Sequence, residues 1–261
     1  MTNFEAFILS IIEGLSEFLP ISSTAHLIIA EELLGIPSSK FLNFFTIFIQ
    51  LGAIFAVPIL YFNRLIKDFK IYFFVTISFI PAVILGLLLN DFLETLFEGY
   101  WFIALSWVAG GIILIKIDDW IVNQKKEIDL TSDLTIKSSL KIGLYQCIAM
   151  IPGVSRSGAT IVGGRLSGLS HTNAVEFSFL LAIPTLLGAT VKKMIDYRQD
   201  FEILFSQDHL ILLGIGFIGS FFVAIFTIKW MVNFIKNKGF SIFGYYRVII
   251  GIVLMIFLWL R

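Results

Sequence analysis

Six long apolar stretches alternate with short polar segments along this chain of 261 residues. The stretches cover residues 41–62, 71–89, 100–117, 172–191, 209–232 and 243–260. Each is about as long as the roughly 17–25 residues that a helix needs to cross a bilayer. A soluble helical core does not require repeated apolar runs of this length. The pattern therefore predicts an all-α polytopic membrane protein with six transmembrane helices.

Two further apolar segments are each broken by a proline. Residues 3–35 contain Pro20 and residues 139–170 contain Pro152. On either side of its proline, each segment is too short to cross a bilayer. Each also precedes three of the six spans, so the same order of features occurs twice. We expect two re-entrant helix-loop-helix segments, one in each half, because irregular backbone at membrane depth is tolerated only inside protein or around a water-filled cavity.

The basic residues of the short loops predict an orientation, because lysine and arginine accumulate in cytoplasmic loops. Loops 63–70, 118–141 and 233–242 carry them, whereas loop 90–99 has none. The first three are therefore expected to face the cytoplasm, although the basic residues that follow position 191 do not fit. Three crossings per half then invert the second half relative to the first, as in inverted-repeat transport folds.

We expect the two halves to form a single integral membrane domain, residues 1–261. Repeat 1 covers residues from about 1 to 120 and repeat 2 from about 139 to 261, and the polar linker between them covers about 118–138. Neither half is expected to be stable alone.

The composition agrees with a membrane protein and narrows its partners. The chain is 57% hydrophobic and 15% charged, whereas a soluble domain is roughly 45–50% apolar and about 25% charged. The 19 basic and 19 acidic residues balance, so the charge does not predict binding to nucleic acid. Cys147 is the only cysteine, which excludes an internal disulfide. We expect no removed signal peptide, because no basic region precedes the first apolar stretch.

The first interrupted segment carries two carboxylates, in the sequence Glu13-Gly-Leu-Ser-Glu17-Phe-Leu-Pro-Ile-Ser-Ser-Thr-Ala-His26. Their spacing of four places Glu13 and Glu17 on one face of a helix. Carboxylates this close repel unless one is protonated or a cation lies between them. A hard divalent ion, Mg²⁺ or Ca²⁺, would suit their oxygen atoms and would also bind phosphate. An interfacial helix whose glutamates reach water is the alternative interpretation.

Hydroxyl groups and an imidazole follow the proline of the same segment. Ser22, Ser23 and Thr24 stand where a new helix can begin, and the free N–H groups of a helix N-terminus form an anion site. His26 is close enough in sequence to accept a hydroxyl proton or to protonate a leaving group. Simple helix capping and a buried structural histidine are the alternatives.

The second interrupted segment reads Pro152-Gly-Val-Ser-Arg-Ser-Gly-Ala-Thr160. Its glycines allow the backbone to approach a ligand, and Arg156 offers a planar fork that suits phosphate oxygens. The segment lacks the lysine and spacing of a nucleotide-binding P-loop. It is predicted to bind phosphate and to bring Arg156 near Glu13 and Glu17. A glycine-rich helix break with an arginine reaching for the membrane surface is the alternative.

These two motifs resemble the signature motifs of the bacterial undecaprenyl-diphosphatase family of the bacitracin-resistance type, and the resemblance covers essentially the whole chain. It implies removal of the terminal phosphate from undecaprenyl diphosphate in the bacterial cytoplasmic membrane, which regenerates the lipid carrier for peptidoglycan synthesis. It further implies dependence on a divalent cation and a site that opens to the extracytoplasmic side. Ala25 stands where many members have glycine, which removes little except backbone freedom.

Carried over onto this sequence, the motifs assign a role to each candidate residue. Ser23 is expected to be the nucleophile, with His26 as base and then acid, although direct attack by a water that His26 or a glutamate activates remains open. Glu13 and Glu17 are expected to hold the cation, and Arg156 to bind the distal phosphate. Further phosphate contacts are expected from Ser22, Thr24, Gly153, Ser155, Ser157, Gly158 and Thr160.

Two other functions compete with hydrolysis. A flippase for the monophosphorylated lipid would also need inverted repeats, broken helices and an anion-binding loop. It has no evident need for two glutamates and a histidine beside hydroxyl groups unless they relay protons. A nonenzymatic bacitracin-resistance or lipid-binding protein is the third alternative. The sequence leaves open whether the protein is a monomer or a homodimer.

Overall fold

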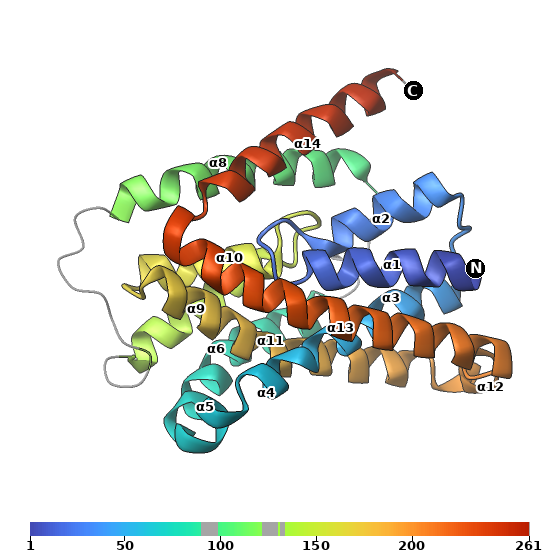
Figure 1. The fold of residues 1–261 in the computed structure, drawn as a ribbon, viewed down its shortest axis with the longest axis horizontal. Helices are drawn as coiled ribbons and strands as arrows, with labels where there is room; N and C mark the ends of the chain where they lie inside the picture. The colour runs from blue at the N-terminus through green and yellow to red at the C-terminus, as the bar shows by residue number, and fades with distance from the viewer. Residues whose placement is uncertain (90–98, 122–129, 131–133, 261) are drawn as a thin grey trace.

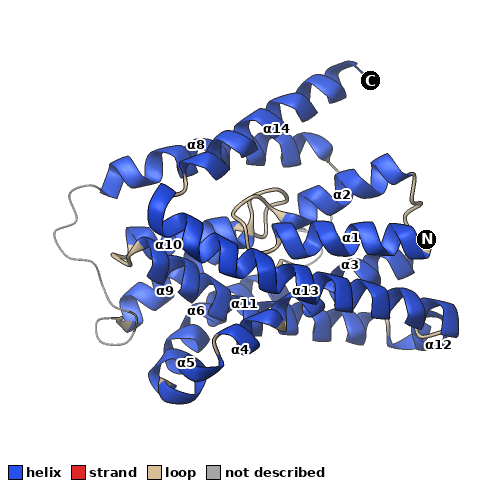
Figure 2. Cartoon of the chain, viewed as in Figure 1, coloured by secondary structure: helices blue, strands red, loops and turns tan. Residues whose placement is uncertain are grey.

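Helices and turns make up the part of the chain that the structure, a computed structural model, describes: residues 1–89, 99–121, 130 and 134–260 (Figure 2). The α-helices are α1 (Asn3–Ser16), α2 (Ser23–Leu34), α3 (Lys40–Ile54), α4 (Ala56–Leu60), α5 (Phe62–Lys67), α6 (Phe69–Leu88), α8 (Tyr100–Ile121), α9 (Ile136–Ile148), α10 (Arg156–Leu166), α11 (His171–Asp196), α12 (Phe201–Leu204), α13 (Gln207–Lys238) and α14 (Ser241–Leu260). A short 3₁₀ helix (Arg198–Asp200) precedes α12.

Six helical stretches are long and apolar enough to cross a membrane, as the hydrophobic pattern predicts. They are Lys40–Leu60, Phe69–Leu88, Tyr100–Ile117, His171–Asp196, Gln207–Lys238 and Ser241–Leu260. The all-helical, multi-pass class is therefore confirmed. Most of loop 90–99 and of the expected linker at 118–138 lies outside the described residues.

The first of these spans is divided near its end. Helix α3 ends at Ile54, and the short helices α4 and α5 continue the chain. Pro58 explains the division, because proline has no N–H to pair with the carbonyl four residues earlier, and its ring crowds that carbonyl.

Both interrupted segments form helix-turn-helix units. Helix α1 leads through a first turn (residues 17–22) into α2, and α9 leads through a second turn (residues 149–155) into α10. The two turns lie side by side beneath the α8–α14 pair (Figure 1). The hydroxyl of Ser157, at the start of α10, connects this helix to the first turn by donating to the Leu19 carbonyl at 2.7 Å.

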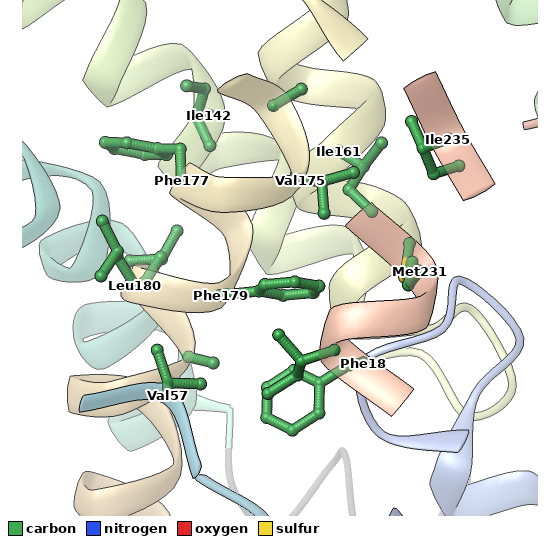
Figure 3. Close-up of a cluster of buried hydrophobic side chains, with 14 of the residues drawn as sticks. Phe18, Val57, Ile142, Ile161, Val175, Phe177, Phe179, Leu180, Met231 and Ile235 are labelled. Carbon is green, nitrogen blue, oxygen red and sulfur yellow. The ribbon is translucent and has the colours of Figure 1, made fainter. Parts of the chain in front are cut away.

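Packing on both sides holds the turns in place. From the first turn, Phe18 enters the main hydrophobic core and meets Phe179 of α11 edge to face, with ring centroids 5.1 Å apart (Figure 3). On the other side α8 and α14 pack closely because small residues face each other: a Cβ added at Gly244 would lie 2.6 Å from the Gly111 carbonyl oxygen. Close backbone approach of this kind is typical of helices that pack in membranes.

Candidate active site

Two of the predicted residues, Glu17 and Arg156, form a buried ion pair. Nη2 of Arg156 lies 2.5 Å from Oε1 of Glu17, and their side chains are 12% and 6% exposed. The second carboxylate oxygen of Glu17, Oε2, accepts a hydrogen bond of 2.5 Å from the Ser23 hydroxyl. The structure therefore brings together a carboxylate of the first turn, the hydroxyl at the start of α2 and the guanidinium at the start of α10.

Glu13 lies one helical turn before Glu17 and is fully buried. Neither of its carboxylate oxygens has a hydrogen-bond partner among the described residues. Burial, and then repulsion from Glu17, raise the pKa of Glu13 well above the usual carboxyl range, although Arg156 opposes the shift. Glu13 belongs to α1, which is not one of the six candidate membrane spans. A buried carboxylate without a partner is costly unless a proton or a cation neutralises it.

A small polar pocket of about 90 Å³ lies between the two turns. The residues that line it are Glu17, Ser22, Ser23, Thr24, Gln50, Ala149, Ile151, Pro152, Gly153, Ser155, Arg156 and Leu186. Helices α2 and α10 both begin at this pocket, since their first residues, Ser23 and Arg156, line it. Two helix N-termini and a guanidinium at one pocket make a strong anion site.

The two turns share an unusual backbone feature at equivalent positions. Ser22 and Ser155, which immediately precede α2 and α10, have φ of 73° and 77°, and they are the only residues other than glycine with positive φ in the described chain. This region is unfavourable for a residue with a side chain, so such conformations persist only where the surroundings fix them. Ser155 caps α10, since the Gly158 N–H donates to Ser155 Oγ at 3.1 Å. The Ser22 side chain makes no capping bond.

Three predicted phosphate-binding residues do not line the pocket. The Ser157 hydroxyl donates a hydrogen bond to the Leu19 carbonyl, and the Thr160 hydroxyl is hydrogen-bonded to the Ser178 hydroxyl at 2.6 Å. Nη1 of Arg156 donates to the Ser178 carbonyl at 3.0 Å. In this structure Ser157 and Thr160 therefore support the turn and the arginine, and Gly158 supplies the capped N–H.

His26 is not among the residues that line the polar pocket. Its Nδ1 lies 2.7 Å from the Ser22 carbonyl oxygen, and its Nε2 lies 2.7 Å from the Tyr246 hydroxyl. The ring lines a separate, largely apolar cavity of about 590 Å³. Side chains on a helix point back over the preceding turn, which directs the ring toward Ser22. The Ser23 hydroxyl, whose proton His26 is predicted to accept, donates its hydrogen bond to the Glu17 carboxylate in this structure.

Sequence reasoning missed two residues of this region. Gln50 reaches the polar pocket from α3, and no motif distinguishes it. Arg247 of α14 is 1% exposed and donates to carbonyls of both turns. The available signal was an arginine inside the apolar stretch 243–260, since a charge there is costly and marks a candidate functional residue.

The donors at this site suit a divalent cation only in part. Among the described residues, no three acidic, histidine or cysteine side chains group as a metal site. Two carboxylates remain, and the unpaired oxygens of Glu13 are the donors available for a hard cation. A cation there would take its other ligands from phosphate oxygens or water.

Comparison with known proteins gives consistent matches. A family model described as "Bacitracin resistance protein BacA" matches residues 6–253. A relative from Flavobacterium johnsoniae is 50% identical over 257 residues, which are 98% of this chain and 96% of the relative. A relative from Aquifex aeolicus is 46% identical over 97% of both chains, and one from Bdellovibrio bacteriovorus is 42% identical over 99% of this chain and 97% of the relative. All three relatives bear the name "Undecaprenyl-diphosphatase".

Proposed function

The chain belongs to the bacitracin resistance protein BacA family, and we propose that it hydrolyses undecaprenyl diphosphate to undecaprenyl phosphate and phosphate. The observation that carries this proposal is the meeting of Arg156, Glu17 and Ser23 at one pocket where two helices begin. These groups can bind a phosphate, take up a proton and supply a hydroxyl. The reaction recycles the lipid carrier of cell-envelope synthesis and accounts for bacitracin resistance.

In this proposal Arg156 and the N-termini of α2 and α10 bind the terminal phosphate and oppose its negative charge. Stabilisation of charge is the main catalytic contribution expected in phosphoryl transfer. The hydroxyl of Ser23 attacks the terminal phosphorus, and Glu17 accepts its proton, because Glu17 holds the Ser23 hydrogen bond. The bond from that phosphorus to the bridging oxygen breaks, and undecaprenyl phosphate leaves. Water then attacks the phosphoserine, which releases phosphate and restores the Ser23 hydroxyl. Attack by a water that Glu17 activates is the competing route.

Glu13 and Glu17 would hold a divalent cation beside the diphosphate. Such an ion neutralises phosphate charge as it develops. The support on this chain is the buried, unpartnered carboxylate of Glu13. When the substrate binds, Arg156 can shift from Glu17 toward phosphate, which frees a Glu17 oxygen for the ion.

The arrangement of helices supports two inverted repeats with re-entrant segments. If the two halves are equivalent, α1 corresponds to α9 and α6 corresponds to α13. The contact between α1 and α13 then corresponds to the contact between α9 and α6, and both contacts are present. The same exchange relates Ser22 to Ser155. We place the protein in the bacterial cytoplasmic membrane because of its family, and we infer from the resemblance of the two motifs that the polar pocket opens to the extracytoplasmic side.

Phosphate release by the purified protein in detergent tests this function. Detergent provides no second compartment into which a flippase could move lipid, so phosphate release there indicates hydrolysis. We expect phosphate release from undecaprenyl diphosphate that EDTA abolishes and that Mg²⁺ or Ca²⁺ restores. Glu13→Gln should lower activity by at least tenfold and raise the cation concentration needed for half-maximal rate. Glu202→Gln, a change at an exposed carboxylate of α12, is the control. Release of no phosphate by the wild type would contradict the proposal and would favour the transporter.

A further inference from the structure

Arg247 uses all of its hydrogen-bonding capacity on backbone carbonyls. An arginine side chain has five N–H donors. Here they reach five carbonyl oxygens, those of Trp107 (3.4 Å), Pro20 (3.1 Å), Val154 (2.8 Å), Ser106 (2.9 Å) and Gly153 (3.0 Å). The acceptors belong to the first turn, the second turn and α8. One side chain of α14 therefore connects α8 to both of the turns whose residues line the polar pocket.

A single atom of Arg247 joins the two turns. Nη1 donates both to Pro20 of the first turn and to Val154 of the second. These acceptors are two residues before Ser22 and one residue before Ser155, the two serines with positive φ. Strained backbone of this kind requires surroundings that fix it. Arg247 supplies part of that constraint to both turns at once, as Trp107 does for the first turn through its 2.9 Å bond to the Ile21 carbonyl.

The charge of Arg247 has no acidic neighbour. Within the described chain, no carboxylate lies within ion-pair distance of its guanidinium, whereas Arg156 and Arg64 each have a glutamate. Carbonyl dipoles solvate the charge without cancelling it. Gly153, whose carbonyl Arg247 holds, lines the polar pocket. Arg247 therefore holds a positive charge behind the wall of a pocket suited to anions.

We propose that Arg247 is a positioning residue for the phosphatase reaction: it holds the two turns in the register that aligns Ser23 and Glu17 with Arg156. This proposal rests on the proposed function. Arg247 makes no contact with the reacting groups and acts through the Pro20, Gly153 and Val154 carbonyls. Positioning of this kind affects the chemical step strongly, since a misplacement of about 1 Å can cost roughly a hundredfold in rate.

A glycine on α8 allows a test that leaves Arg247 itself in the protein. A Cβ added at Gly110 would collide with Nη2 of Arg247 and would lie 2.8 Å from its Cζ. Gly110→Ala should therefore displace the guanidinium without changing a residue of either turn. Gly214→Ala in α13 is the matched control, because a Cβ there meets nothing within 4 Å. Both changes replace glycine by alanine within a helix, so their effects on helix propensity are alike.

The measurement is kcat and KM for undecaprenyl diphosphate in detergent, together with the thermal unfolding midpoint. We expect Gly110→Ala to lower kcat by about 10- to 100-fold, with KM within about threefold because Arg156 still binds phosphate. Arg247→Lys should act alike, since lysine keeps the charge but not the five-donor fork. Gly214→Ala should match the wild type.

Three results would overturn the proposal. The first is a kcat for Gly110→Ala within about threefold of that for Gly214→Ala. The second is a rise in KM without a fall in kcat, which would make Arg247 a determinant of binding. The third is loss of the folded state in both Gly110→Ala and Arg247→Lys, which would make its role structural. Failure of the proposed function is distinguishable, because the wild type would then release no phosphate.

Discussion

Replacing Arg156 with alanine would leave the Glu17 carboxylate buried without its cation. The Ser23 hydroxyl would still donate a hydrogen bond to Oε2 of Glu17, but Oε1 would lose the Arg156 nitrogen that lies 2.5 Å away. Glu13, which is already buried and unpartnered, would also lose the nearby positive charge. The variant should therefore be less stable as well as nearly inactive, and the two effects can be separated.

The size of the loss follows from the burial of the pair. Removing one partner of a buried ion pair costs roughly 3–5 kcal/mol. The side chains here are 12% and 6% exposed, and one hydrogen bond to Glu17 remains, so the lower end, about 3 kcal/mol, is expected. For a protein of this size that corresponds to a fall of roughly 6–12 °C in the unfolding midpoint. Adding Glu17→Gln removes the unpaired charge, so the double variant should recover about 2 kcal/mol.

The single cysteine supplies the assay. Cys147 is partly buried in α9, so a thiol-reactive fluorescent dye should report unfolding of the purified protein in detergent without a further label. The midpoint is measured for the wild type, Arg156→Ala, Glu17→Gln and the double variant. Phosphate release is measured on the same samples, and both Arg156→Ala variants should stay below about a hundredth of the wild-type rate.

The ion-pair interpretation would be refuted if the decreases in unfolding midpoint caused by Arg156→Ala and Glu17→Gln were additive. If Glu17→Gln lowers the midpoint further in the Arg156→Ala background, Glu17 does not depend on Arg156 for its charge balance. If Arg156→Ala retains more than about a tenth of the wild-type rate, Arg156 is not the main phosphate contact.

Two further predictions concern the hydroxyl groups of the region. Ser23→Ala should reduce phosphate release by at least a hundredfold if Ser23 attacks phosphorus, and activity near that of the wild type, measured by phosphate release in detergent, would leave the water route in its place. Tyr246→Phe removes the partner of His26 Nε2 and should lower the unfolding midpoint by a few degrees, as loss of about 1 kcal/mol would. The value of kcat should change by less than about threefold, because the His26–Tyr246 pair lies outside the polar pocket. A large fall in kcat at an unchanged midpoint would instead indicate that His26 takes part in catalysis.

Much of the fold could be predicted because it depends on local sequence. A transmembrane helix satisfies its own backbone and needs only a run of apolar residues, so the six spans follow from hydropathy. The turns at Pro20 and Pro152 follow from the geometry of proline. The division of the first span at Pro58 rests on the same property, but the apolar run continues through it and conceals the break.

The candidate site could be predicted only in its parts. The Glu13–Glu17 spacing fixed their shared helix face, and the residue types of the second motif indicated phosphate. Which residue takes the Ser23 hydrogen bond depends on how the first turn folds back, and sequence spacing alone favoured His26 over Glu17. The family resemblance assigns Ser157 and Thr160 to phosphate, and in the structure their hydroxyls hydrogen-bond the Leu19 carbonyl and Ser178.

The helices, their membrane class and the chemistry that each motif carries follow from the amino-acid sequence, because these depend on properties of neighbouring residues. Three-dimensional packing is what pairs Arg156 with Glu17 across 139 positions and lets Arg247 bridge turns 227 and 93 positions away. Such contacts depend on the packing of whole helices, and no local periodicity encodes the distance between residues that meet only after the chain has folded.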